Sequence, residues 1–165
     1  AMQADLRGNR LVGTVGACVW AGLHAADGAL LLSRNMLSGT VGRISPDTHT
    51  VLLNDNRLTG DLDATAVPDD AAAQLEHLDV SDNRGLRGSL ASLLSRTLRL
   101  ESLGAARNAF TDHDDDDDSM TSRHEKKLTM DVIAEMPNLR RYDVSGTRLR
   151  VPTPVAAGLG VSAHS

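Results

Sequence analysis

Acidic and hydroxyl side chains between residues 114 and 125 have the spacing of a calcium-binding loop. Positions 1, 3, 5, 7, 9 and 12 of an EF-hand loop would be filled by Asp114, Asp116, Asp118, Met120 (through its carbonyl), Ser122 and Glu125. The sixth position is Ser119, where the loop requires glycine for a sharp turn. A run of aspartates also produces the Asp-x-Asp spacing by composition alone. Three interpretations stay open: a solvated acidic segment, adventitious divalent binding, or a calcium site.

The other residues capable of catalysis do not form a recognised constellation. His124 and Glu125 match the start of the zinc-protease helix motif, but Leu128 occupies the place of its second histidine. Cys18 is the single cysteine, which excludes an internal disulfide and a zinc site built on cysteines. We expect Cys18 to be a buried apolar residue, with a reactive thiol as the alternative. The sequence therefore predicts no enzymatic activity and no cofactor.

The composition narrows the class of partner. The formal net charge is −5 and the pI is near 5.6, which disfavours nucleic acid. Aromatic residues make up 2% of the chain, which argues against an aromatic-lined pocket and for a core of leucine, valine and alanine. The longest uncharged stretch, residues 11–26, is broken by glycine and too short to span a bilayer, so we expect no membrane insertion.

The pattern Leu-x-x-Asn-x-Leu-x-Gly recurs along the chain. It reads LRGNRLVG at residues 6–13, LSRNMLSG at residues 32–39 and LNDNRLTG at residues 53–60, followed by a stretched copy at residues 80–88 and weaker copies at residues 105–110 and 144–149. Its asparagine positions are Asn9, Asn35, Asn56, Asn83 and Asn108, followed by Thr147. Successive positions lie 26, 21, 27 and 25 residues apart, and the last step is 39 residues. A period of this length is typical of a solenoid of stacked coils.

The residue types in this pattern have physical roles in a stacked coil. The leucines supply apolar side chains that each coil must bury against its neighbours. An asparagine amide has both an acceptor and donors, so it can satisfy backbone groups where a strand bends into a loop. We therefore expect Asn35, Asn56 and Asn83 to be buried and bonded to backbone. Short parallel strands are predicted at residues 4–7, 30–33, 51–54, 78–81, 103–106 and 142–145.

The repeated pattern resembles the leucine-rich repeats of plant receptors and of kinetoplastid surface antigens. The last unit, with its Ser145-Gly146-Thr147 step, is most similar to the parasite repeats. The resemblance covers roughly residues 5–150. It implies an α/β solenoid of about six units, with a short-stranded parallel sheet on the concave face and irregular or helical convex segments.

The long last step contains an insertion. Residues 1–150 would form the repeat domain, with an acidic insertion at about 111–122, a helix at about 123–135 and a C-terminal tail at 151–165. Ser122 and Glu125 have capping-box spacing, and apolar residues follow at helical intervals. We expect residues 112–119 to be poorly ordered, because adjacent carboxylates repel one another.

We expect the binding site on the concave face. Side chains alternate along a strand, so the residues on either side of each core leucine point away from the core. Ser33 and Ala106 are expected there, and the candidate binding residues are Leu31, Arg34, Leu52, Asp55, Asp79, Asp82, Arg107 and Asp143. An apolar pair beside patterned charge is typical of a protein-binding surface. A merely solvated sheet face is the alternative. A rim of arginines after the asparagines, Arg10, Arg57, Arg84 and Arg148, offers a second surface, for an anionic partner.

The sequence thus predicts a protein–protein interaction module that binds a protein partner on the concave face. One alternative is a structural or cell-surface antigen that displays the repeats. A weaker alternative is a divalent-metal-responsive adaptor that uses the acidic insertion. Polar caps are not evident at either end of the repeats, and uncapped coils would permit edge-to-edge self-association.

Overall fold

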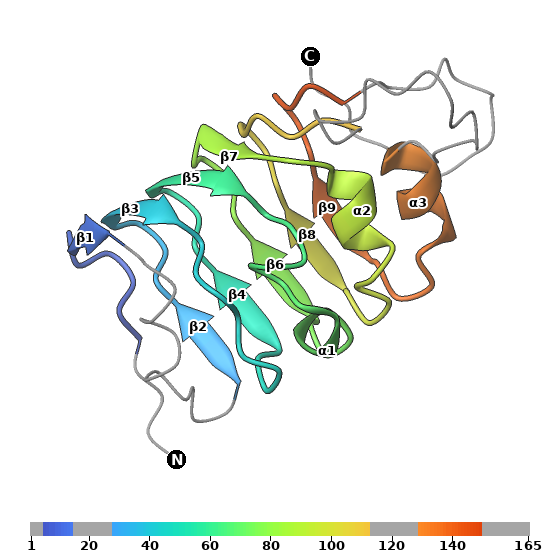
Figure 1. Cartoon of the computed structure of the whole chain (residues 1–165), viewed down its shortest axis with the longest axis horizontal. Coiled ribbons are helices and arrows are strands. Elements are labelled where there is room, and N and C mark those ends of the chain that lie inside the picture. The colour runs from blue at the N-terminus through green and yellow to red at the C-terminus, as the bar shows by residue number, and fades with distance from the viewer. Residues whose placement is uncertain (1–4, 15–27, 113–128, 150–165) are drawn as a thin grey trace.

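The computed structural model describes residues 5–14, 28–112 and 129–149, which form a parallel β-solenoid with few helices (Figure 1). Two parallel sheets run along it, and strands of successive coils lie side by side in each. Cys18, most of the acidic insertion, the first part of the predicted helix and the predicted tail lie outside the described residues. Among the described residues, no helix has the length and apolar character needed to cross a membrane.

The first sheet contains the strands that the repeat predicted. Its order is β2 (Ala29–Leu31), β4 (Thr50–Leu52), β6 (His77–Asp79), β8 (Ser102–Gly104) and β9 (Arg141–Asp143), and every pair is parallel. Asp5 extends this sheet by a single parallel bridge to Leu31. The predicted positions are confirmed, but the predicted bounds are wrong: each strand begins one residue earlier and ends two residues earlier.

The strands are short because the backbone turns soon after each of them. Three residues after β2, β4, β6 and β8, the chain adopts a left-handed conformation, with φ of 58°, 55°, 58° and 54° at Arg34, Asp55, Asp82 and Arg107. A left-handed residue cannot continue an extended strand. In each of these coils, the asparagine follows this left-handed residue directly.

The second sheet was not predicted. It contains β1 (Val12–Thr14), β3 (Met36–Thr40), β5 (Arg57–Asp61) and β7 (Gly85–Arg87), paired in parallel in that order. The resemblance to leucine-rich repeats implied irregular or helical segments here. The strands begin one to three residues after the asparagine, so backbone of neighbouring coils meets there and pairs with an offset in register. These segments contain glycine, but they also contain Thr40 and Thr59. Threonine favours strands, so these two residues could have indicated the second sheet.

Three short helices complete the described structure: α1 (Asp69–Ala72), α2 (Leu90–Leu94) and α3 (Thr129–Glu135). Ser89 caps α2 by accepting a hydrogen bond from the backbone N–H of Ser92 at 3.2 Å. Helix α3 occupies the second half of the predicted 123–135 helix and packs beside α2. The helices lie in the segments that lead back to the first sheet: α1 between β5 and β6, α2 between β7 and β8, and α3 before β9 (Figure 1).

The core between these layers consists mainly of leucine, valine and alanine, as predicted. Val51, Leu53, Leu58 and Leu78 are each at most 1% exposed. Each side chain belongs to one coil and packs against equivalents in the next, which is how a solenoid buries surface that a single unit cannot. Phe110, 1% exposed, is an aromatic addition to this aliphatic core.

The base of the insertion differs from the prediction. Asp112, expected in a poorly ordered acidic segment, is 5% exposed, and its Oδ1 accepts a hydrogen bond from the backbone N–H of Thr129 at 3.0 Å. Its backbone carbonyl also accepts from the Ser89 hydroxyl at 3.2 Å. A carboxylate becomes favourable in a buried position when N–H groups are directed at it. Asp112 therefore joins the two sides of the insertion, while residues 113–119 lie outside the described residues.

Candidate protein-binding face

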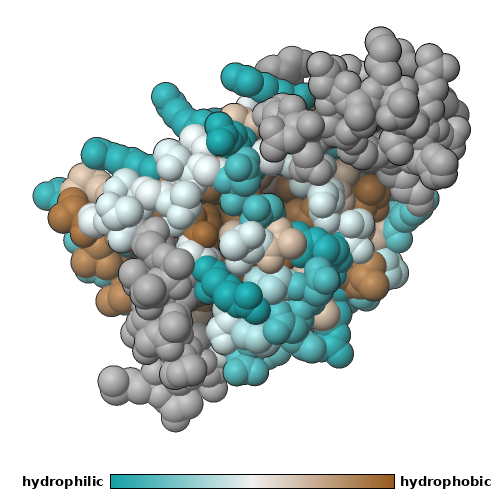
Figure 2. Space-filling model, in the orientation of Figure 1, coloured by the Kyte–Doolittle hydropathy of each residue, from teal (hydrophilic) through white to brown (hydrophobic). Residues whose placement is uncertain are grey.

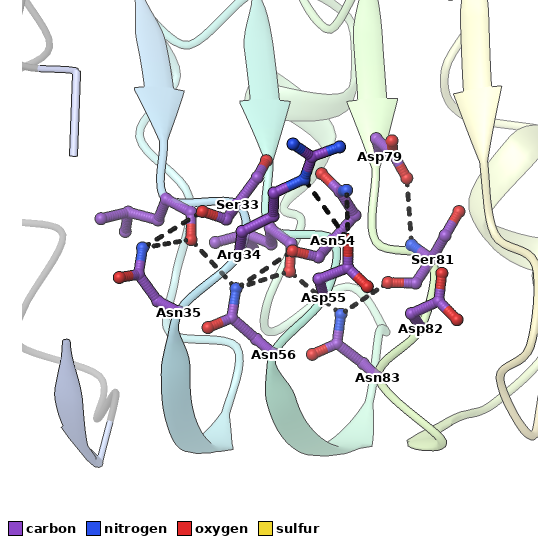
Figure 3. A network of polar contacts seen from close by, with 12 residues as sticks. Ser33, Arg34, Asn35, Asn54, Asp55, Asn56, Asp79, Ser81, Asp82 and Asn83 are labelled. Carbon is purple, nitrogen blue, oxygen red and sulfur yellow. Dashed lines mark hydrogen bonds and ion pairs between the residues drawn. The ribbon is translucent and has the colours of Figure 1, made fainter. Parts of the chain in front are cut away.

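The asparagine ladder holds the coils that present the candidate face. Asn35, Asn56 and Asn83 are 7%, 8% and 3% exposed, and each amide nitrogen donates to backbone carbonyls of its own coil and of the preceding one (Figure 3). Asn108 repeats this arrangement at 5% exposure. Thr147 makes one such bond, from its hydroxyl to the Val144 carbonyl at 2.6 Å. The predicted burial and bonding of these asparagines are confirmed.

Strand register places several predicted binding residues in one line across the first sheet. The paired residues, called here the central row, are Asp5, Leu31, Leu52, Asp79, Gly104 and Asp143. Residues paired in register have side chains on the same face of a sheet. The row therefore presents two adjacent leucines, a carboxylate, a residue without a side chain, and a second carboxylate.

The leucine pair lies outside the core. Leu30 and Val51, one position earlier on their strands, belong to or pack against the buried core cluster, whereas Leu31 and Leu52 do not. Both leucines of the pair are half-buried. Their direct pairing between β2 and β4 creates a continuous apolar area that the packing of the solenoid does not use. Such an area, next to polar side chains, suits the centre of an interface.

Asp79 and Asp143 in the central row each accept a hydrogen bond from the backbone N–H two residues later. Asp79 Oδ1 accepts from the Ser81 N–H at 3.1 Å, and Asp143 Oδ1 accepts from the Ser145 N–H at 3.0 Å. A side chain at residue 104 would collide with the Asp79 carboxylate. The Asp79 carboxylate therefore leans toward β8, over the position that Gly104 leaves open.

Asp5, at the other end of the row, is already paired within its own coil. Arg7 donates to it through both its side chain, at 2.6 Å, and its backbone. The side-chain hydrogen bond from Arg7 is the main reason that the pKa of Asp5 is lowered to about 2, and the backbone bond adds to it. Both side chains are about half exposed, so the pair is a surface feature that salt will screen.

The four left-handed residues beside the central row carry charges and form two ion pairs. Arg34 Nε lies 3.8 Å from Asp55 Oδ2, and Arg107 donates two hydrogen bonds to Asp82 (Figure 3 shows the first pair). The Arg107 side chain lowers the pKa of Asp82 below its ordinary value, and Asp82 in turn raises the pKa of Arg107. The corresponding positions in the first and last coils are Gly8 and Gly146, with φ of 71° and 66°.

These contacts divide the predicted binding residues into two groups. Arg34, Asp55, Asp82 and Arg107 lie together but neutralise one another in pairs. Leu31, Leu52, Asp79 and Asp143 lie in the central row, and the residues that the structure describes form no ion pair with Asp79 or Asp143. The sequence could not predict which of these residues form ion pairs, because the reach of an arginine across strands depends on the register.

Two other predictions about the surface are corrected. Ser33 and Ala106, expected to face outward, are 5% and 1% exposed, because the chain already turns inward toward the asparagine there. The arginines after the asparagines are all exposed, but they do not stack in one row. Arg57 pairs with Ser38 and not with Met36, and Met36 pairs with Val12, so neighbouring coils are offset by two residues there, and β5 and β7 are offset by one.

No group of three or more histidine, cysteine, aspartate or glutamate side chains among the described residues is placed to hold a metal ion. Residues 113–128, with the proposed calcium ligands, fall outside the described part of the chain. The described side chains of the face can make apolar contacts and ion pairs.

Comparison with known proteins defines the class of fold. No protein-family model matches the chain, and no curated protein matches it. The structure is similar to the crystal structure of the leucine-rich-repeat ectodomain of the receptor kinase SOBIR1 from Arabidopsis thaliana. The TM-score is 0.59 at 23% sequence identity, and the match covers 88% of this chain and 70% of the other. Together with the repeats and the parallel sheets, this similarity shows that the chain has a leucine-rich-repeat fold.

Proposed function

We propose that this chain is a non-catalytic protein-interaction module of about six repeat units. It binds a partner protein on the outward face of the five-stranded sheet, the face predicted to be concave. The observation that supports this most directly is the pairing of Leu31 with Leu52 in register, outside the core and beside Asp79. A fold of repeated coils with a continuous strand face provides such a surface without further specialisation.

The leucine pair would supply most of the affinity. Complete burial of one leucine side chain is worth about 1.5–3 kcal/mol, and both are now half-buried, so each retains part of that amount for a partner. Charged residues beside the pair would contribute to orientation and association rate. The display and metal-responsive alternatives stay predictions from the sequence.

Affinity capture with matched variants tests this function. The double variant Leu31→Ser/Leu52→Ser should lose captured partner that the wild-type chain retains. Leu98→Ser is the control: Leu98 is 61% exposed in the loop before β8, so the change also removes exposed apolar surface but leaves the central row intact. Circular dichroism of each variant verifies the fold. Equal capture by all three proteins would contradict binding at this face.

We also propose that β1 supports edge-to-edge self-association. This strand ends the second sheet, and Val12 within it is 73% exposed, next to Leu11 at 36%. Figure 2 shows hydrophobic surface gathered at the β1 end of the described structure. An unpaired strand edge with apolar side chains is a template for another chain.

Light scattering tests this self-association. It should show concentration-dependent dimers that Val12→Lys abolishes, and a monomer at all concentrations would refute the proposal.

A further inference from the structure

A carboxylate on the face that forms no ion pair among the described residues indicates which charge a partner should carry. This inference rests on the proposed function. Asp55 and Asp82 are paired with arginines, and Asp5 is paired with Arg7. In the central row, Asp79 uses Oδ1 for the Ser81 N–H, and no other hydrogen bond or ion pair of Asp79 occurs among the described residues. Asp79 is therefore the carboxylate beside the leucines that has capacity for a cation.

Strand register gives the distance between the apolar and anionic positions. Neighbouring strands lie about 4.8 Å apart, so the middle of the Leu31–Leu52 pair is about 12 Å from Gly104 along the row. The Asp79 carboxylate leans over Gly104, so its charge lies near the far end of that span. A side chain at residue 104 would fill the space that the Asp79 carboxylate occupies.

An extended partner segment lying across the strands matches this distance. In an extended chain, residues four apart lie on the same face and about 13 Å from one another. The flexible stem of a lysine or arginine accommodates the remaining ångström. We infer that the partner presents an extended segment with an apolar side chain on Leu31 and Leu52 and, four residues away, a lysine or arginine on Asp79.

Asp143 extends the acidic character of the row beyond Gly104. It lies in register with Gly104 on the other side, so a cation above Gly104 has carboxylates on both flanks. Arg141 lies on the same face of β9 as Asp143, two residues earlier, and forms no recorded ion pair with it among the described residues. Asp143 interacts electrostatically with Arg107. Asp79 is consequently the principal contact and Asp143 a secondary one.

Selection from a random peptide display library on the wild-type chain tests the inference. Enriched peptides should combine an apolar residue with lysine or arginine at a spacing of four. A spacing of seven or eight would indicate a helical occupant and overturn the extended geometry. Enrichment of acidic peptides, or of none, would overturn the inference as well.

A synthetic peptide with leucine and lysine four residues apart in a threonine background then permits a direct measurement by fluorescence anisotropy. Asp79→Asn should weaken its binding about tenfold, the effect of losing one close interfacial charge pair. Asp82→Asn is the matched control and should change affinity less than twofold, because that carboxylate is already held by Arg107. Replacing the peptide lysine with glutamine should remove the effect of Asp79→Asn, since the two changes delete the same contact.

The outcomes separate the inference from the proposed function. If Leu31→Ser/Leu52→Ser abolishes peptide binding while Asp79→Asn does not, the face binds protein but the assigned cation contact is wrong. If neither set of changes affects binding, both the contact and the face are wrong. If Asp82→Asn weakens binding as much as Asp79→Asn, the whole acidic surface acts through long-range attraction and the specific contact is refuted.

Discussion

Replacing Asn56 with alanine tests the physical basis of the solenoid. The Asn56 amide oxygen accepts from the Leu37 N–H at 3.1 Å, and the amide nitrogen donates to the carbonyls of Leu32 at 3.0 Å and Leu53 at 2.9 Å. The side chain is 8% exposed, so water cannot readily replace these bonds. One asparagine thus joins backbone of its own coil to backbone of the coil before it.

The magnitude follows from which backbone groups lose their partners. The Leu32 carbonyl keeps a donor from Asn35, and the Leu53 carbonyl keeps one from Asn83. The Leu37 N–H loses the acceptor that the structure gives it. An unsatisfied, partly buried donor costs about 1–3 kcal/mol, so the Asn56→Ala variant should lose about that much unfolding free energy.

Urea unfolding followed by circular dichroism provides the measurement, with Asn54→Ala as the control. Asn54 lies in the same coil, but its side chain makes one long contact, 3.4 Å to Asp55 Oδ2, at the surface. Its replacement should change the unfolding free energy by less than about 0.5 kcal/mol. Asn56→Thr should fall between the two, because Thr147 shows that a hydroxyl retains one of the bonds. If Asn56→Ala and Asn54→Ala unfold at the same urea concentration, the ladder does not stabilise the coils as argued.

Four further predictions concern the charged residues. Arg107→Gln should raise the pKa of Asp82 toward its ordinary value of 3.8 in an NMR titration, and an unchanged pKa would contradict the ion pair. Because the folded-state pKa is depressed, the stabilisation from this pair is present above the unfolded-state pKa and is lost as the pH falls below about 4, so the wild type and the variant should converge in acid. Arg34→Gly should be more stable than Arg34→Ala by about 0.5–1 kcal/mol in urea, because glycine tolerates the φ of 58° there; equal stability would show that the turn is unstrained. Deleting residues 113–119 should leave the melting temperature unchanged, whereas Asp112→Ala should lower it by removing the bond to the backbone at the start of α3; a large effect of the deletion would reveal a structural role for those residues. Millimolar calcium should shift the melting temperature by no more than about one degree, and a saturable rise would establish a calcium site.

The repeated residues by themselves determined the solenoid and the positions of its strands. Apolar residues recur at fixed places in the units, asparagine recurs in five of the six, and each unit contacts its neighbours in the same manner, so a local pattern specifies the stacking. Asn35, Asn56 and Asn83 could be predicted as buried because a carboxamide in an apolar pattern needs backbone partners. The outward position of Leu31 and Leu52 followed from alternation along a strand.

The tertiary structure alone decided which side chains meet across the coils. Coils that lie side by side come from residues 21 to 39 positions apart, so the pairing of Arg107 with Asp82 depends on register and side-chain reach. The same dependence explains why Asp79 has no ion pair among the described residues, why the segments after the asparagines form a second sheet, and why Asp112 is buried against α3. Periodicity in the sequence specifies which residues are equivalent, whereas contact between different coils is determined by their offset and by the direction in which each turn leaves its strand.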